Sequence, residues 1–81
     1  MRVTVRLFAR LRDLASTGEI TRDVPSDSTV AAIWSSLVRE WPEMAPYEKS
    51  ISVAVNADYS RFSAVVSDGD EIAFLPPVSG G

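Results

Sequence analysis

One apolar stripe at helical spacing, between residues 30 and 41, constrains the fold of this chain more than any other feature. Its members recur every three or four residues: Val30, Ile33, Trp34, Leu37, Val38 and Trp41. Pro42 follows directly, and proline is not tolerated in a helix interior. Pro25-Ser26-Asp27-Ser28 comes before the stripe, so we expect the helix to begin with Asp27 or Ser28 as its N-cap.

The segments on both sides of this helix alternate between apolar and polar residues, which is typical of β-strands with one buried face. Phe8 is an exception, because this large aromatic residue falls on the polar side of the first strand. We expect strands at residues 1–7, 19–24, 51–55 and 71–75, and a further short one near 62–66. We also expect a short turn or helical piece at 9–15, an irregular connection at 42–50, a turn at 56–58, and a positive φ at Gly69.

The order of these elements predicts an α+β protein with the β-grasp architecture, a mixed sheet of four to five strands packed on one main helix. We expect a domain at residues 1–75 and an extended C-terminal tail at residues 76–81. The first and last strands are parallel neighbours in this architecture, so residues 8–12 should lie beside the exit of the last strand.

Phe8 and Leu75 would both face away from the core at this exit, and Tyr59 is a candidate third member of the same group. Together they predict an exposed apolar patch at the root of the tail, which is what a partner-binding surface requires. The alternative is that the chain's own loops partly cover this second face of the sheet.

The C-terminal residues form a stiff lead-in that ends in two glycines, Leu75-Pro76-Pro77-Val78-Ser79-Gly80-Gly81. Each proline fixes φ near −65°, so the segment should leave the domain extended. The glycines lack Cβ atoms, so another protein can close around them with little steric cost. The alternative reading is a frayed terminus without a function.

Cysteine and histidine are both absent, which excludes disulfides and a catalytic thiol and leaves a transition-metal site with carboxylate ligands alone. We therefore expect no bound metal and no bound cofactor. The longest apolar run has five residues, and no charged-then-apolar leader comes before the first strand. We expect no membrane association, no secretory signal and a cytoplasmic protein.

Positive charge is concentrated at the start of the chain, in Arg2, Arg6, Arg10 and Arg12, although the net charge is −3. This pattern is compatible with a nucleic-acid-binding patch, but four arginines on an acidic chain are few for a phosphate footprint. We expect solvated strand and turn positions for these residues and no nucleic-acid partner.

Three segments resemble the small subunits of molybdopterin synthase, in the MoaD/ThiS family of ubiquitin-like sulfur carriers. They are Leu7-Phe8-Ala9-Arg10-Leu11-Arg12-Asp13, Val53-Ala54-Val55-Asn56 and the stretch from Asp68-Gly69-Asp70 to Leu75-Pro76-Pro77-Val78-Ser79-Gly80-Gly81. The resemblance covers nearly the whole chain. Leu75 stands where many relatives carry phenylalanine, and Tyr59 stands where an aliphatic residue is common.

The resemblance implies a mechanism. An ATP-dependent activating enzyme would adenylate the Gly81 carboxylate, and a sulfur donor would convert the adenylate to a thiocarboxylate. Gly81 would then donate sulfur to cyclic pyranopterin monophosphate (precursor Z) in the large subunit of the synthase, within a heterotetramer of two small and two large subunits. The small subunit is itself non-catalytic, and ATP is used by the activating enzyme.

The resemblance also implies roles for individual residues of this chain, at the positions that match the motifs of the family. Gly80 would give the clearance for threading, and Pro76, Pro77, Val78 and Ser79 would direct the tail. Phe8, Tyr59 and Leu75 would bind partners, and Arg12 matches an arginine that recurs in the family, with a solvated or capping role as its alternative.

Other functions share the Gly-Gly end. One is a sulfur carrier of another pathway, such as a thiamin-like one, which the Pro76-Pro77 pair disfavours. A second is a ubiquitin-like modifier of protein lysines. A third is a β-grasp binding module whose tail is inert, in which case trimming Gly81 would leave its activity intact.

Overall fold

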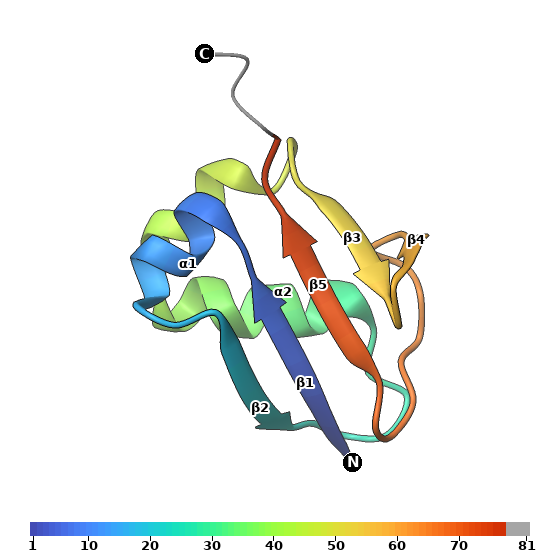
Figure 1. The fold of residues 1–81 in the computed structure, drawn as a ribbon. Helices are drawn as coiled ribbons and strands as arrows, with labels where there is room; N and C mark the ends of the chain where they lie inside the picture. The colour runs from blue at the N-terminus through green and yellow to red at the C-terminus, as the bar shows by residue number, and fades with distance from the viewer. Residues whose placement is uncertain (78–81) are drawn as a thin grey trace.

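The computed structural model describes residues 1–77. Five strands form one mixed sheet in the order β2-β1-β5-β3-β4 (Figure 1). The strands are β1 (Arg2–Leu7), β2 (Glu19–Asp23), β3 (Ser52–Val55), β4 (Asp58–Ser60) and β5 (Glu71–Leu75). The helices are α1 (Ala9–Ala15), α2 (Val30–Glu40) and the 3-10 helix η1 (Pro42–Tyr47). The predicted α+β class and β-grasp architecture are confirmed.

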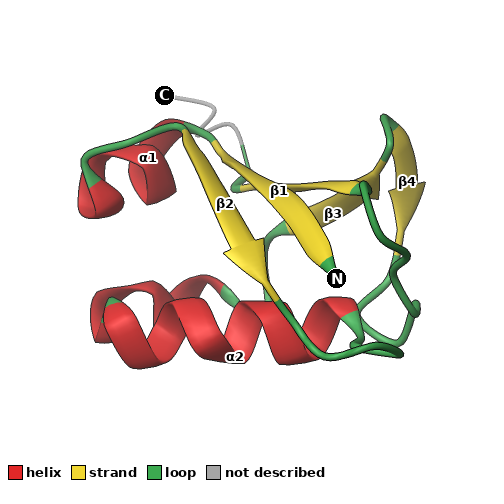
Figure 2. Cartoon of the chain, turned by 90° about the horizontal axis from the view of Figure 1, so that it is seen from below, coloured by secondary structure: helices red, strands yellow, loops and turns green. Residues whose placement is uncertain are grey.

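The core lies between the sheet and α2, which form two layers in Figure 2. Alternate residues of β1 and β5 supply the sheet side of the core, and the predicted stripe of α2 supplies the other side. The buried side chains include Val3, Val5, Leu7, Ile72 and Phe74 from the sheet and Val30, Ile33, Trp34 and Leu37 from α2. The rings of Trp34 and Phe74 lie 5.1 Å apart between their centroids and join the two layers.

Helix α2 begins one or two residues later than predicted, and the predicted N-cap, Asp27 or Ser28, is wrong. Thr29 is the N-cap, because its backbone is extended and its Oγ1 accepts a hydrogen bond from the Ala32 N–H at 3.1 Å. The hydroxyl of Ser28 donates instead to the carbonyl of Pro25 at 2.6 Å. Asp27 lies in the turn before it with φ 65°.

The end of α2 agrees with the prediction that Pro42 stops the helix. The last helical residue is Glu40, and the N–H of the C-cap, Trp41, donates to the carbonyl of Leu37. Pro42 then begins η1, so the connection that we expected to be irregular contains a 3-10 helix, and this helix buries Met44. Among residues 1–77, no helix is long and apolar enough to cross a membrane.

The short extra strand was predicted near residues 62–66, and this placement is wrong. It lies at 58–60, where β4 pairs with β3 through a tight turn. Asn56 and Ala57 are the two central residues of this turn, with φ values of 51° and 71°. Two positive φ values in a two-residue loop match the twist of a β-hairpin, and asparagine tolerates this conformation.

Residues 62–66 pack against the start of α2 instead of forming a strand. The carbonyls of Phe62 and Ala64 accept hydrogen bonds from the N–H groups of Ala31 and Val30, both at 2.9 Å. These N–H groups belong to the first turn of α2, and N–H groups in the first turn of a helix have no acceptor within the helix. Two carbonyls of this segment therefore accept hydrogen bonds from the N-terminus of α2 instead of pairing with a strand of the sheet.

Strands β1 and β5 are parallel, as predicted, with Leu7 opposite Phe74. The two strands run in the same direction and end at the same edge of the sheet (Figure 1). Phe8 and Leu75, the residues just after this pair, therefore lie near each other. The turn into β5 contains Gly69 with φ 86°, which confirms the expected positive φ.

Candidate functional site

A hollow of about 300 Å³ lies on the face of the sheet opposite α2. Its walls come from three parts of the sequence, at residue 8, at residues 54–59 and at residues 71–75. The lining residues are Phe8, Ala54, Ala57, Tyr59, Glu71, Ala73 and Leu75. The structure therefore brings together Phe8, Tyr59 and Leu75, the three residues from which we predicted an apolar patch.

Two alanines make the floor of this hollow. Ala54 on β3 lies opposite Ala73 on β5 in the sheet, and Tyr59 on β4 lies opposite Ala54. Side chains alternate between the two faces of a strand, so Ala54 and Ala73 face away from the core that Val53 and Phe74 fill. The small alanine side chains leave space between the larger residues at the edges of the hollow.

Phe8 is placed by the junction between β1 and α1. Its backbone is still extended, and its carbonyl accepts hydrogen bonds from the N–H groups of Leu11 and Arg12 at 3.1 and 3.4 Å. Ala9 follows with φ 50°, so the chain turns into α1 directly after Phe8. The side chain remains on the open face of the sheet, where it is 38% exposed.

Tyr59 is 84% exposed, and the turn before it is fixed by Asn56. The Asn56 side chain donates to the Asp70 carboxylate at 2.9 Å and accepts from the Glu71 N–H at 2.9 Å. The Asn56 N–H also donates to the Glu71 carbonyl at 2.8 Å. These three bonds fasten the β3–β4 turn, including Ala57, to the start of β5.

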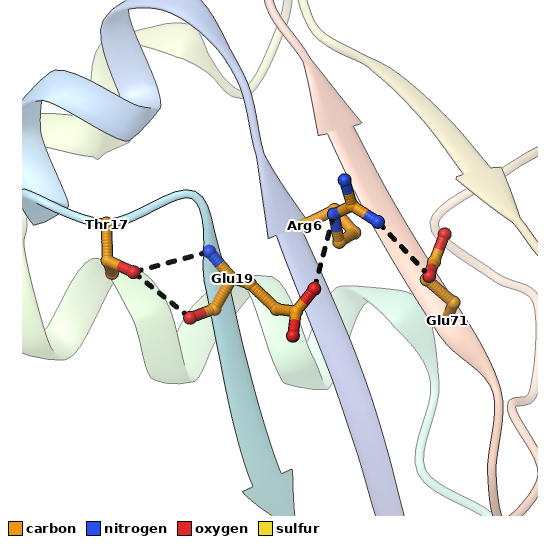
Figure 3. Close-up of polar contacts among 4 residues, drawn as sticks. All are labelled: Arg6, Thr17, Glu19 and Glu71. Carbon is orange, nitrogen blue, oxygen red and sulfur yellow. Dashed lines mark hydrogen bonds and ion pairs between the residues drawn. The ribbon is translucent and has the colours of Figure 1, made fainter.

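Arg6 lies at the border of the hollow and forms ion pairs with two carboxylates. Its guanidinium lies 3.7 Å from the Glu19 carboxylate and 3.5 Å from the Glu71 carboxylate (Figure 3). It also lies over the ring of Phe8, with the Cζ atom 5.9 Å from the ring centroid. The apolar surface therefore has a polar border on the side of β1 and β2.

Arg12, which we also predicted as a site residue, does not line the hollow. It is exposed on α1, and its side chain lies against Gly18: a Cβ added to Gly18 would be 3.4 Å from both Cδ and Nε of Arg12. Within residues 1–77, it forms no ion pair. A contact between Arg12 and a partner stays a prediction.

The root of the predicted tail lies beside the hollow. Leu75 ends β5 opposite Ser52, and Pro76 and Pro77 follow as a half-buried and an exposed residue. The other predicted tail residues, Val78, Ser79, Gly80 and Gly81, lie outside the described residues. In the described part of the chain, no three Asp and Glu side chains are grouped closely enough to hold a metal ion.

Sequence reasoning missed five residues of the site, namely Ala54, Ala57, Glu71 and Ala73 in the lining and Arg6 at its border. A usable signal was present in Val53-Ala54-Val55 and Ile72-Ala73-Phe74, where a small residue stands between two core residues. This signal has meaning only after the register places Ala54 opposite Ala73.

Comparison with known proteins agrees with this geometry. Residues 5–81 match the model of the ThiS family. The molybdopterin synthase sulfur carrier subunit of Arabidopsis thaliana is 37% identical over 79 residues, which are 98% of this chain and 82% of that protein. The subunit of the same name from Escherichia coli (strain K12) is 32% identical over 81 residues, with 98% and 99% covered.

A solved structure shares the whole fold. The solution structure of small archaeal modifier protein 1 from Methanosarcina acetivorans superimposes with a TM-score of 0.81 and 32% identity, and the match covers 99% of this chain and 96% of that one. The match to the family model extends over nearly the full sequence, and the two curated relatives are each more than 30% identical. The chain therefore belongs to the ThiS family, as its sequence motifs predicted.

Proposed function

We propose that this chain is a cytoplasmic sulfur carrier and the non-catalytic small subunit of a molybdopterin synthase, with Gly81 as the carrier of the sulfur atom. Its membership of the ThiS family supports this proposal. So do the two relatives named above, because both are sulfur carrier subunits of molybdopterin synthase.

The observation that carries the proposal is the position of the hollow at the root of the tail. Parallel pairing of β1 and β5 puts Phe8 beside Leu75, and residues 76–81 follow directly. A partner that binds Phe8, Tyr59 and Leu75 therefore contacts the protein where the tail begins. Pro76 and Pro77 restrict the backbone there, which lowers the entropy that the partner must overcome when it orders the tail.

The chemistry begins with activation of the terminal carboxylate, because this anion is a poor electrophile at neutral pH. A carboxylate oxygen of Gly81 attacks the α-phosphorus of ATP on the activating enzyme, and pyrophosphate leaves. A donor that supplies sulfur at the level of sulfide then attacks the acyl carbon, and AMP leaves with the electron pair of the C–O bond. The product is a thiocarboxylate at Gly81.

The second stage takes place on the large subunit. The thiocarboxylate sulfur attacks a side-chain carbon of precursor Z and forms a C–S bond, and the oxygen that this carbon carried leaves with the electron pair of the C–O bond. Hydrolysis of the resulting thioester then leaves the sulfur on the pterin and restores the Gly81 carboxylate. Two such transfers give the dithiolene of molybdopterin, in a heterotetramer of two small and two large subunits. We propose that basic residues of the large subunit bind the phosphate of the pterin. We propose that this chain itself binds no cofactor. Val78 and Ser79 would direct the tail, and Gly80 would give it clearance.

Intact mass measurement tests this proposal directly. Incubation with ATP, a matching activating enzyme and a sulfur source should change the mass by the exchange of one oxygen for one sulfur. A variant that lacks Gly81, and a variant with one alanine added after it, should show no such change and no sulfur transfer, although both remain folded. Sulfur transfer by either variant would refute the role of Gly81.

A ubiquitin-like modifier is the second candidate, and the similarity to small archaeal modifier protein 1 favours it. The same activated glycine would then form an isopeptide bond with a lysine of another protein. Lys49 is the single lysine in the sequence, so chains of linked copies could form only through Lys49. Mass spectrometry of tryptic digests distinguishes the two, because only the modifier leaves C-terminal residues of this chain on target lysines.

A further inference from the structure

The outer edge of β2 has backbone groups that no other strand uses within residues 1–77 (Figure 1). The carbonyl of Gly18 and the N–H of Val24 bond to the side of β1, at 2.9 and 2.8 Å. Residues alternate between the two sides of an antiparallel ladder. The N–H and C=O groups of Glu19, Thr21 and Asp23 therefore point outward.

At one of these three positions, Glu19, the outward N–H and C=O groups already have a hydrogen-bond partner within the chain. The Thr17 hydroxyl accepts from the Glu19 N–H at 3.3 Å and donates to the Glu19 carbonyl at 3.1 Å (Figure 3). The outward groups of Thr21 and Asp23 have no such partner among the described residues. An open edge strand of this kind pairs readily with another extended chain.

A groove of about 350 Å³ lies beside this open part of the edge, between β2 and α2. Residues that line it from both elements include Arg22, Val24, Ala32, Ile33, Ser36 and Arg39. Because side chains alternate along a strand, every second side chain of a segment added to β2 would point toward α2 and into this groove. Val24 and Ala32, which are half-buried and exposed, offer it apolar surface.

The groove is positively charged, although the chain as a whole has a net charge of −3. Arg22 and Arg39 both line it. Arg22 pairs with Glu40, whereas Arg39 has no ion pair with any residue from 1 to 77. The one carboxylate of the lining, Asp23, is paired with Arg2 at 3.2 Å.

We propose that the outer edge of β2 and the groove beside it bind an extended acidic segment of another protein, which adds a strand to the sheet next to Thr21 and Asp23. An acidic side chain of this segment reaches Arg39, and an apolar one covers Val24. A second copy of this chain fits poorly, because symmetric pairing centred on Thr21 would place Glu19 opposite Asp23 of the other copy, and like charges in this position repel.

The test uses two capped peptides and the full-length, isotope-labelled protein. The first peptide is acetyl-Thr-Val-Ser-Asp-Ser-Val-Thr-amide, and the second has lysine in place of aspartate. We expect the aspartate peptide to shift the amide resonances of Thr21, Asp23 and the groove side of α2, and to bind about fivefold more tightly than the lysine peptide. The preference should decrease with added salt.

Three variants make the result specific. Arg39→Glu should remove or reverse the preference for aspartate, and Lys49→Glu, which makes the same change of charge outside the groove, should keep it. Ala32→Phe should fill the groove and abolish binding of both peptides, and its unchanged amide spectrum elsewhere would show that it is folded.

Four outcomes would overturn the proposal. The first is an absence of shifts at about 1 mM peptide, and the second is equal binding of both peptides. The third is a set of shifts around Ala54 and Tyr59 instead of β2. The fourth is a concentration-dependent dimer whose formation the aspartate peptide does not reduce. The sulfur-transfer measurements above do not depend on any of these results.

Discussion

Phe8 and Phe74 show at the residue scale how one side-chain type serves two purposes. Phe74 is completely buried between β5 and α2, where its ring contacts Trp34. Phe8 is 38% exposed at the hollow, where its ring contacts Arg6. The first side chain therefore contributes mainly to the free energy of folding. The second leaves apolar surface that becomes buried only when a partner binds.

We predict that Phe8→Asp weakens binding of the proposed partner, the large subunit of a molybdopterin synthase, at least tenfold, because it puts a charge into an apolar contact surface; tenfold corresponds to about 1.4 kcal/mol. Titration calorimetry measures this effect. The free energy of unfolding in urea should fall by less than about 1 kcal/mol, whereas Phe74→Ala should lower it by about 3 to 5 kcal/mol. Val65→Asp is the matched control, since Val65 is exposed and lies outside the hollow.

If Val65→Asp weakened binding as much as Phe8→Asp, the effect would come from charge alone and not from the hollow. A large loss of stability in Phe8→Asp would instead place the Phe8 ring in the core.

The β3–β4 hairpin illustrates the element scale, because a single side chain holds it against β5. Asn56 tolerates the positive φ that the turn needs and also bonds to Asp70 and Glu71. Asn56→Gly keeps the backbone freedom and removes both side-chain bonds. We predict a loss of about 1 to 2 kcal/mol in the free energy of unfolding. Urea titration measures the loss, and hydrogen exchange should show faster exchange in β4 than in β1.

Asn56→Asp gives the matched comparison for this clamp. It retains an acceptor for the Glu71 N–H but places a carboxylate beside that of Asp70, so it should destabilise the protein at neutral pH more than Asn56→Gly does. Equal stability of native protein and Asn56→Gly would show that the turn conformation alone fixes the hairpin.

At the scale of the whole molecule, β5 is the strand on which the sheet depends. It lies between β1 and β3 and pairs with both, and it supplies Ile72 and Phe74 to the core. The chain can therefore complete its core only when its last strand is present. Among residues 1–77, every buried core residue lies at or before Phe74.

Two truncations test this dependence. Removal of residues 71–81 should abolish cooperative unfolding, because β1 and β3 would lose their common neighbour. Removal of residues 78–81 should leave the melting temperature within about 2 °C of the native value, since it removes no described core contact. Circular dichroism during heating measures both. A cooperative transition in the chain that lacks residues 71–81 would contradict the central role of β5.

The sequence by itself determined the features that depend on near neighbours. The stripe of α2, its stop at Pro42, the alternation of β1 and the positive φ of Gly69 each follow from spacing or from the stereochemistry of one residue. The order of these elements was enough to predict the parallel pairing of β1 and β5, and the terminal motif was enough to predict the family.

The tertiary structure alone decided which residues meet across the sheet. Ala54 and Ala73 form a floor because β3 and β5 pair in one register, and Arg6 borders it because β1 adjoins β5. Contacts between segments also gave the N-cap to Thr29 and kept residues 62–66 out of the sheet, because their carbonyls bond to the first turn of α2. Periodicity fixes the face on which a side chain lies, but its neighbours from distant segments depend on how the whole chain buries its apolar surface and satisfies its backbone hydrogen bonds.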